Sequence, residues 1–249
     1  MGDFNDGIVV ETDHRPWPMP HAAWVMTQTW NDLLFAHWPA DARVLRSLVP
    51  SRFDLDTFDS EAWIGVVPFS MTNVVPRFVP PLPWFSAFPE LNVRTYVRVA
   101  DKPGVYFFSL DAANAVAVGA ARTLLNLPYY TADMQVQPAG DGVQCTSRRL
   151  SEPAARFEGR YRGLGSPHPP AAGTLEYFLT ERYCLYAIDR RSRPYRLDIH
   201  HPPWLLEPAD AEIAANSMAS SAGIELPSTA PLLHFSKRQD AVAWPPESI

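Results

Sequence analysis

The stretch from residue 92 to 100 shows the pattern that most limits how this chain can fold. From 93 to 99, valine or threonine at odd positions alternates with arginine or tyrosine at even positions. Because successive side chains of a strand point to opposite faces, the alternation predicts a strand with one buried face and one arginine-bearing face. Further runs typical of strands lie at 62–71, 104–111, 133–137, 143–149, 155–162 and 195–199. The 26 prolines favour short strands and loops over long helices.

A few shorter segments have helical spacing instead. They lie at 41–49, 112–126, 175–182 and 208–222. Asp41 is expected to cap the first helix, which Pro50 ends, and Gly223 is expected to end the last. We see no repeat and no linker, so residues 24–249 are expected to form one domain after a loosely structured arm at 1–23. The pattern predicts an α+β fold whose mainly antiparallel sheet curls like a barrel around a cavity.

The charge balance excludes one large class of partners. The chain has 21 Lys and Arg against 27 Asp and Glu, a formal net charge of −6, whereas nonspecific nucleic-acid binding needs a basic surface. No run approaches the roughly 18 apolar residues of a membrane span, and residues 1–20 lack the apolar core of a signal peptide. We therefore expect a cytoplasmic protein that binds neither nucleic acid nor membranes. Its oligomeric state stays open, with a homo-oligomer possible.

Seven segments, in order, resemble the YqjF-like family. They are 35–39, 45–50, 63–69, 90–97, 107–112, 178–183 and 199–204. A further segment, 115–130, resembles the active-site region of the acetoacetate decarboxylase superfamily, to which the YqjF-like family belongs. In that superfamily a run of small residues leads into Gly-Arg-Glu and then into Pro-Lys-Lys. Arg122 and Pro128 hold the same relative places in this chain.

The resemblance implies a cavity closed by a barrel-like sheet, with the turn at 128–130 projecting into it. Tyr129 and Tyr130 stand where the superfamily has its lysine pair. Thr123 stands in place of the glutamate of Gly-Arg-Glu, and Glu90 matches an acidic residue that precedes a strand. The resemblance therefore implies the fold but not the decarboxylation.

The small number of lysines also argues against decarboxylation. The whole chain contains only Lys102, in a turn-like segment, and Lys237, in a polar segment, and both are typical of exposed lysines. An imine-forming enzyme needs a lysine that is neutral near pH 7, through burial or a neighbouring cation. We therefore expect no Schiff-base lysine and no acetoacetate decarboxylase activity.

Three residues are candidates for catalysis. A hydroxyl of Tyr129 or Tyr130 in an apolar pocket can stabilise an oxyanion or act as a general acid. Glu90 can act as a general base if its surroundings raise its pKa. The alternatives stay open: the tyrosines can simply pack, with their hydroxyls satisfied, and Glu90 can be the partner that holds Arg94 in place.

Four residues are candidates for ligand binding. Arg94 and Arg122 can form a clamp for a carboxylate, because a guanidinium pairs with carboxylate through two hydrogen bonds. Arg182 and His200 complete the set. The alternative for the arginines is a structural ion pair with Glu90 or another buried carboxylate.

The histidines and cysteines carry no recognisable metal site. His200 and His201 are adjacent on a predicted strand, so they point to opposite faces and cannot easily share an ion. His37 is expected to be a core histidine. Cys145 and Cys184 have no histidine in their local sequence and are expected to be inert. We expect neither metal nor cofactor.

Three functions fit these features. The first is binding of a small organic acid or carbonyl compound in an internal cavity. The second is a cofactor-free lyase, isomerase, hydratase or cyclase that works through Tyr129 or Tyr130 and Glu90. The third is a structural or partner-binding protein whose cavity is filled by side chains.

Overall fold

Strands make up most of the chain in the computed structural model, which describes residues 8, 9, 11–80 and 86–249. They are β1 (Met26–Ala40), β2 (Asp54–Leu55), β3 (Ala62–Pro76), β4 (Phe88–Val99), β5 (Lys102–Ala112), β6 (Tyr129–Ala139), β7 (Gly142–Arg149), β8 (Arg156–Gly163), β9 (Cys184–Ile188), β10 (Pro194–His200), β11 (Glu207–Asn216), β12 (Leu232–Ala243) and β13 (Glu247–Ser248). The helices are α2 (Ala42–Leu48), α3 (Ala115–Leu124) and α4 (Leu175–Thr180), with a 3-10 turn, η1, at Ser220–Ala222.

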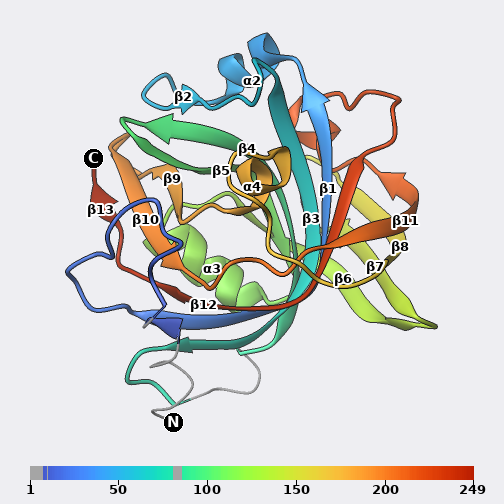
Figure 1. The fold of residues 1–249 in the computed structure, drawn as a ribbon, viewed down its shortest axis with the longest axis horizontal. Helices are drawn as coiled ribbons and strands as arrows, with labels where there is room; N and C mark the ends of the chain where they lie inside the picture. Colours follow the sequence, from blue (N-terminus) through green and yellow to red (C-terminus); the bar gives the residue numbers. More distant parts are fainter. Residues whose placement is uncertain (1–7, 10, 81–85) are drawn as a thin grey trace.

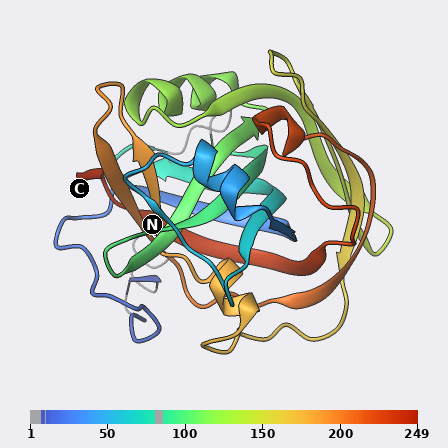
Figure 2. The ribbon, with the colours of Figure 1, turned by 90° about the horizontal axis from the view of Figure 1, so that it is seen from above.

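Within the described residues, nine strands close into a ring in the order β5-β6-β7-β8-β11-β12-β1-β3-β4, because β4 pairs with both β3 and β5. Strands β9 and β10 leave this ring at β5 and return to it at β12. They form a second, smaller ring that shares β12, β1, β3, β4 and β5 with the first. Figures 1 and 2 show β9 and β10 on one side of the molecule and β6, β7 and β8 on the other.

The interior of the nine-stranded ring, which we call the packed lobe, is filled by one apolar cluster. Met134 from β6, Cys145 from β7 and Phe157 and Tyr161 from β8 meet side chains from the shared strands there. Phe157 and Cys145 have no exposed surface. This close packing explains why the long hairpins of β6, β7 and β8 stay curled over the sheet.

The shared strands face both rings, so their side chains alternate between two interiors. In β4, Leu91 and Val93 join the packed lobe. Glu90, Asn92 and Arg94 point to the other ring. The strand is therefore buried on both faces, and whether a residue number is odd or even decides which interior its side chain enters.

Three of the four expected helices form, and the first has the cap that the sequence predicts. Asp41 accepts a hydrogen bond from the backbone N–H of Arg43 at the start of α2. The Asn114 side chain accepts hydrogen bonds from the first backbone N–H groups of α3. Within this helix, only the side chain of Val118 is buried. An α+β fold with a curled, mainly antiparallel sheet and a few short helices is confirmed.

The prediction of a helix at 208–222 is wrong. Residues 207–216 form strand β11, which pairs with β8 and β12, and only the 3-10 turn η1 follows. Ala209, Ala211 and Ile213 pack against the packed lobe while Asp210 and Glu212 face outward. Partners distant in sequence thus override the helical preference of an alanine-rich segment.

The arm expected at 1–23 lies partly outside the described residues. Its described part forms no strand after Glu11 and is held against β10 by two buried side chains, Arg15 and Trp17. The Nη1 of Arg15 donates to the carbonyl of Ile199 over 2.8 Å, and Trp17 donates to Asp198 over 3.3 Å. Among the described residues, no helix is long and apolar enough to cross a lipid bilayer.

Candidate functional site

The smaller ring encloses a cavity of about 440 Å³, so we call this region the hollow lobe. All of its strands contribute side chains to the wall, and helix α3 covers one side through Ala117, Ala120 and Ala121. Most of the lining is apolar. The volume is within the roughly 300–1,000 Å³ that is typical of small-molecule sites.

Three polar residues of β4 form a stripe along this wall. Glu90, Asn92 and Arg94 occupy alternate positions, so they share a face and their Cα atoms are about 6–7 Å apart along the strand. Glu90 is 3% exposed and Asn92 is 4% exposed. The side-chain oxygen of Asn92 is buried without a hydrogen-bond partner. Unsatisfied buried groups are rare in native proteins, so the stripe is suited to a polar ligand.

Glu90 and Tyr129 form a hydrogen-bonded pair in the cavity wall. The hydroxyl of Tyr129 donates to Oε2 of Glu90 over 2.9 Å. Burial, with a smaller contribution from the nearby Asp111, raises the pKa of Glu90 to about 7, although the hydrogen bond from Tyr129 lowers it. The same burial and the Glu90 carboxylate raise the pKa of Tyr129. The carboxyl can therefore gain or lose a proton near neutral pH.

Arg94 is a cation of the cavity lining that has no ion pair with any described carboxylate. Its guanidinium carbon lies 5.3 Å from the centre of the Phe35 ring, and its Nε is buried without a hydrogen-bond partner. Among the described residues, no carboxylate lies within ion-pair distance of it. The suggested partnership of Glu90 with Arg94 does not form, because Glu90 pairs with Tyr129 instead.

Arg182 also lines the cavity, but its charge is already compensated. Its Nη1 binds Asp56 over 2.7 Å, and its Nε donates to the carbonyl of Phe178 over 2.6 Å. Its guanidinium also lies over the rings of Phe178 and Tyr96, at 4.2 and 4.9 Å. These contacts make Arg182 a structural part of the wall rather than a free anion site.

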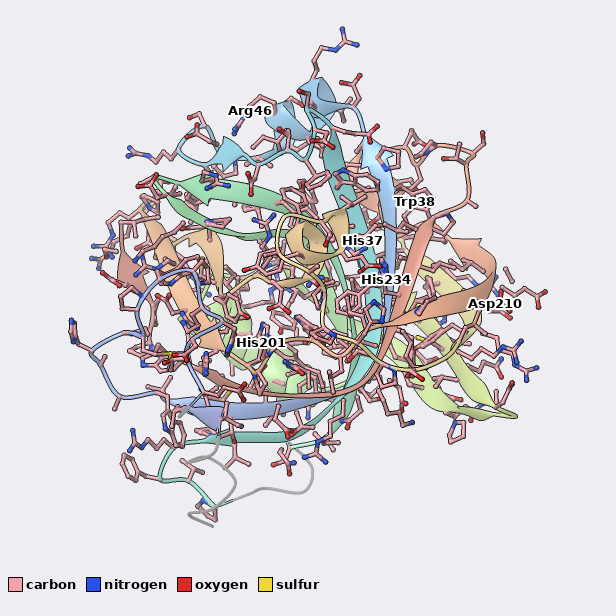
Figure 3. The ribbon with its side chains drawn as sticks, viewed as in Figure 1. His37, Trp38, Arg46, His201, Asp210 and His234 are labelled. Carbon is pink, nitrogen blue, oxygen red and sulfur yellow. The ribbon has the colours of Figure 1, made fainter. Side chains whose placement is uncertain are left out.

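The two adjacent histidines point to opposite sides, as expected for a strand. His201, not His200, lines the cavity, and Figure 3 shows it in the interior while Asp210 lies at the outer edge of β11. His201 stacks on Tyr183 at 4.6 Å, and burial lowers its pKa to about 4. His200 faces the arm, where it contacts Arg15 and the carbonyl of Ile8.

Tyr130 and Arg122 lie outside the cavity. Tyr130 faces away from Tyr129, and the guanidinium of Arg149 lies 3.9 Å from its ring centre. Arg149 in turn binds both oxygens of Asp111. Arg122 is exposed on the outer face of α3. The structure therefore brings Glu90, Arg94, Tyr129 and Arg182 together but separates Tyr130, Arg122 and His200 from them.

The exposed part of the lining marks the mouth of the cavity. Leu124 is 78% exposed and Val25 is 40% exposed. Pro245 and Pro246 are also exposed and line the same edge. The mouth is thus apolar, whereas Glu90 and the other buried polar groups lie inside.

Most of the chain, residues 27–240, matches the model of the DUF2071 family. The chain belongs to this family. The family is described as "Uncharacterized conserved protein". The chain is also 49% identical over 227 residues to Uncharacterized protein YqjF of Bacillus subtilis (strain 168), covering 91% of this chain and 93% of that protein.

Two solved structures show how this DUF2071 member compares in fold. Acetoacetate decarboxylase from Legionella pneumophila subsp. pneumophila str. Philadelphia 1 has a TM-score of 0.62 and 12% identity, covering 97% of this chain and 95% of that one. Enduracididine biosynthesis enzyme MppR complexed with pyruvate has a TM-score of 0.62 and 10% identity, covering 92% and 91%. These similarities confirm the acetoacetate decarboxylase-like fold that the sequence predicts.

The two lysines of this DUF2071 member lie away from the cavity lining. Lys237 is 74% exposed and binds Asp32 over 2.5 Å. Lys102 begins β5, and its ammonium lies 5.9 Å from the Trp17 ring centre. His37 is buried as expected, with its Nε2 bound to the Tyr96 hydroxyl over 2.6 Å, although its Nδ1 has no partner.

Asn92 and His201 are among the cavity residues that were not identified from the sequence. Asn92 lies two positions from both Glu90 and Arg94, so the alternation in β4 already places it on their face. His201 had no such signal, because the sequence shows two adjacent histidines without showing which side of the strand is the cavity.

Proposed function

We propose that this DUF2071 member binds a small organic acid in the hollow lobe, with Arg94 as the partner of the carboxylate. One observation carries the proposal: a guanidinium without a carboxylate partner among the described residues lines a largely apolar cavity. A carboxylate there would form charge-assisted hydrogen bonds, which are about twice as strong as neutral ones. The neighbouring Asn92 amide adds polar groups on the same face.

The alternatives from the sequence are less well supported. A filled cavity is disfavoured, because about 440 Å³ of the hollow lobe is open and neither tyrosine fills it. Imine chemistry of the acetoacetate decarboxylase kind is also disfavoured, because Lys102 and Lys237 lie away from the lining. A protein of similar fold, MppR, has been crystallised with pyruvate, which is itself an organic acid.

The test is a thermal-shift screen with keto acids, hydroxy acids and aromatic carboxylates. A ligand at 100 times its Kd stabilises a protein by about 2.7 kcal/mol, which is a shift of roughly 5–10 °C for a chain of this size. Arg94→Gln removes the charge and is expected to abolish the shift.

Arg122→Gln is the matched control. It removes the same charge from the exposed face of α3 and is expected to leave the shift unchanged. A shift that survives Arg94→Gln, or silence across the whole panel, would contradict the proposal.

A second candidate function rests on the Glu90–Tyr129 pair. A carboxylate with a pKa near 7 can take a proton from the carbon beside a ligand carbonyl, while the Tyr129 hydroxyl stabilises the oxygen that gains charge. This is the proton transfer that a lyase or isomerase without a cofactor would need.

Deuterium exchange tests this second function. The protein is incubated with 2-oxobutanoate in D₂O, and the loss of the proton signal at the carbon beside the carbonyl is followed by NMR. We expect exchange above the buffer rate, lost in Glu90→Gln and reduced in Tyr129→Phe with binding retained. Exchange at the buffer rate in the wild-type protein would rule this reaction out for that acid.

A further inference from the structure

We propose that the ligand is an amphipathic monocarboxylate of medium length. Its carboxylate binds Arg94, and its apolar tail runs past Asn92 and Glu90 to α3 and the mouth. This inference rests on the proposed function and narrows its ligand class. Four features carry it: the size of the cavity, the order of its polar groups, the hydrogen-bonded pair midway and the small residues of α3.

The size of the cavity argues against a very short acid. A cavity of about 150 Å³ is enough for benzene, with its six carbons. The hollow lobe, at about 440 Å³, therefore has room for up to roughly 18 non-hydrogen atoms by the same measure. A three-carbon keto acid would leave most of an apolar cavity empty, whereas an acid of eight to ten carbons would fill much of it.

The strand register sets the direction in which the ligand lies. Arg94 pairs with Gly65 and Glu90 pairs with Phe69, whereas Met26, next to the mouth, pairs with Pro76. Along β3, Glu90 therefore lies between Arg94 and the mouth. Arg94 is at the inner end of the cavity, and the exposed apolar residues are at the outer end. A ligand with a carboxylate at one end and an apolar tail at the other matches this arrangement.

The middle of the cavity tolerates an apolar chain. Glu90 and Tyr129 lie there, and the Tyr129 hydroxyl already donates to Glu90 over 2.9 Å. A tail that passes them leaves this hydrogen bond in place, which limits the cost of covering the two polar groups.

Helix α3 provides the space for the tail. Ala117, Ala120, Ala121 and Leu124 follow the i, i+3, i+4, i+7 spacing of one helix face, and all line the cavity. Larger side chains at the alanine positions would occupy the same volume. The alanines of α3 are therefore expected to set the longest tail that fits.

The first experiment measures the Kd of butanoate, hexanoate, octanoate and decanoate by isothermal titration, with pyruvate and 1-octanol as further probes. Affinity is expected to rise about four-fold per methylene that enters the cavity and then to level off. Octanoate is expected to bind on the order of 100-fold more tightly than butanoate, and Arg94→Gln is expected to abolish the preference for octanoate over 1-octanol.

The second experiment changes the length of the cavity. Ala120→Leu and Ala121→Leu each add three carbons to the lining and are expected to shift the best acid to one two or three carbons shorter. Ala115→Leu makes the same change at an exposed position on the same helix and is expected to leave the series unchanged. Having two cavity variants keeps the test valid if one fails to fold.

The outcomes separate this inference from the proposed function. Binding of pyruvate and butanoate that depends on Arg94, without a gain from octanoate, would overturn the tail but keep the acid site. Equal binding of octanoate and 1-octanol, unaffected by Arg94→Gln, would overturn both. Unchanged length preference in both α3 variants would show that the tail does not lie against the helix and would overturn this inference alone.

Discussion

The packed lobe and the hollow lobe share strands β12, β1, β3, β4 and β5, yet one interior is filled and the other is open. Both are lined mostly by apolar side chains. The difference lies in what covers the shared wall. Over the packed lobe, β6, β7 and β8 project large side chains such as Phe157 and Tyr161. Over the hollow lobe, α3 presents alanines.

The comparison shows that a cavity need not come from a gap in the sheet. It arises where an element of small side chains faces a wall that is otherwise like that of the core. The two faces of the shared wall also differ in chemistry at a few positions. On β4, the face toward the hollow lobe carries Glu90, Asn92 and Arg94, whereas the face toward the packed lobe carries the apolar Leu91 and Val93. The filled side stabilises the fold, and the open side is where we propose that a ligand binds.

The largest expected effect is in the packed lobe. Phe157→Ala removes a ring with no exposed surface and is expected to lower the free energy of unfolding by about 3–5 kcal/mol. Leu124→Ala, at the mouth of the hollow lobe, is expected to change it by less than about 0.5 kcal/mol. Chemical denaturation measures both. Similar losses in the two variants would remove the distinction between the lobes.

The next effect is a pH dependence that originates in the hollow lobe. The pKa of Glu90 is raised from 4.5 to about 7, chiefly by burial. Between these values the folded protein binds more protons than the unfolded chain, so stability falls as pH rises through that window. The loss is expected to reach about 3 kcal/mol above pH 7.

Glu90→Gln keeps an acceptor for Tyr129 but cannot titrate, so its stability relative to the wild type is expected to rise between pH 4.5 and 7. Denaturant unfolding at several pH values measures this. Glu225→Gln, at an exposed position, is the control and should follow the wild-type curve. If Glu90→Gln also follows the wild-type curve, the Glu90 carboxyl is hydrated in the wild-type protein and the hollow lobe is not a dry cavity.

The smallest effect compares two added side chains. Ala132 is 3% exposed in the packed lobe, so Ala132→Leu is expected to destabilise by about 1–3 kcal/mol through overpacking. Ala121→Leu adds the same atoms to the open cavity and is expected to cost less than about 0.5 kcal/mol. Thermal unfolding of both variants measures the difference. Equal costs would mean that the cavity closes up around α3 in solution.

Much of the fold could be predicted because its strands carry local patterns. The strand predicted at 92–100 and the Asp41 cap both form, although β4 is buried on both faces over most of its length rather than on one. Segment 208–222 could not be assigned correctly, because its alanines and Pro208 are typical of a helix start and its strand partners β8 and β12 are distant in sequence.

The site shows a similar limit. Glu90, Arg94 and Tyr129 were found, since strand parity and the family resemblance both point to them. Arg122 was chosen because the family resemblance places it in the active-site segment, whereas α3 turns Ala117 and Ala121 toward the cavity and leaves Arg122 exposed. One position along a helix is about 100° of rotation, and adjacent residues of an extended chain point to opposite faces, as His200 and His201 do. Neither motif therefore shows by itself which residue faces the cavity.

Strand β3 has a consequence for how quickly the proposed ligand would exchange. It is hydrogen-bonded to β1 and β4, and its first half is buried on both faces, so the amide hydrogens there are expected to exchange with water mainly through large-scale unfolding. Helix α3 has a single buried residue and can open at a much lower free-energy cost. The helix would therefore govern the rate of entry, while the wall keeps Arg94 in place throughout.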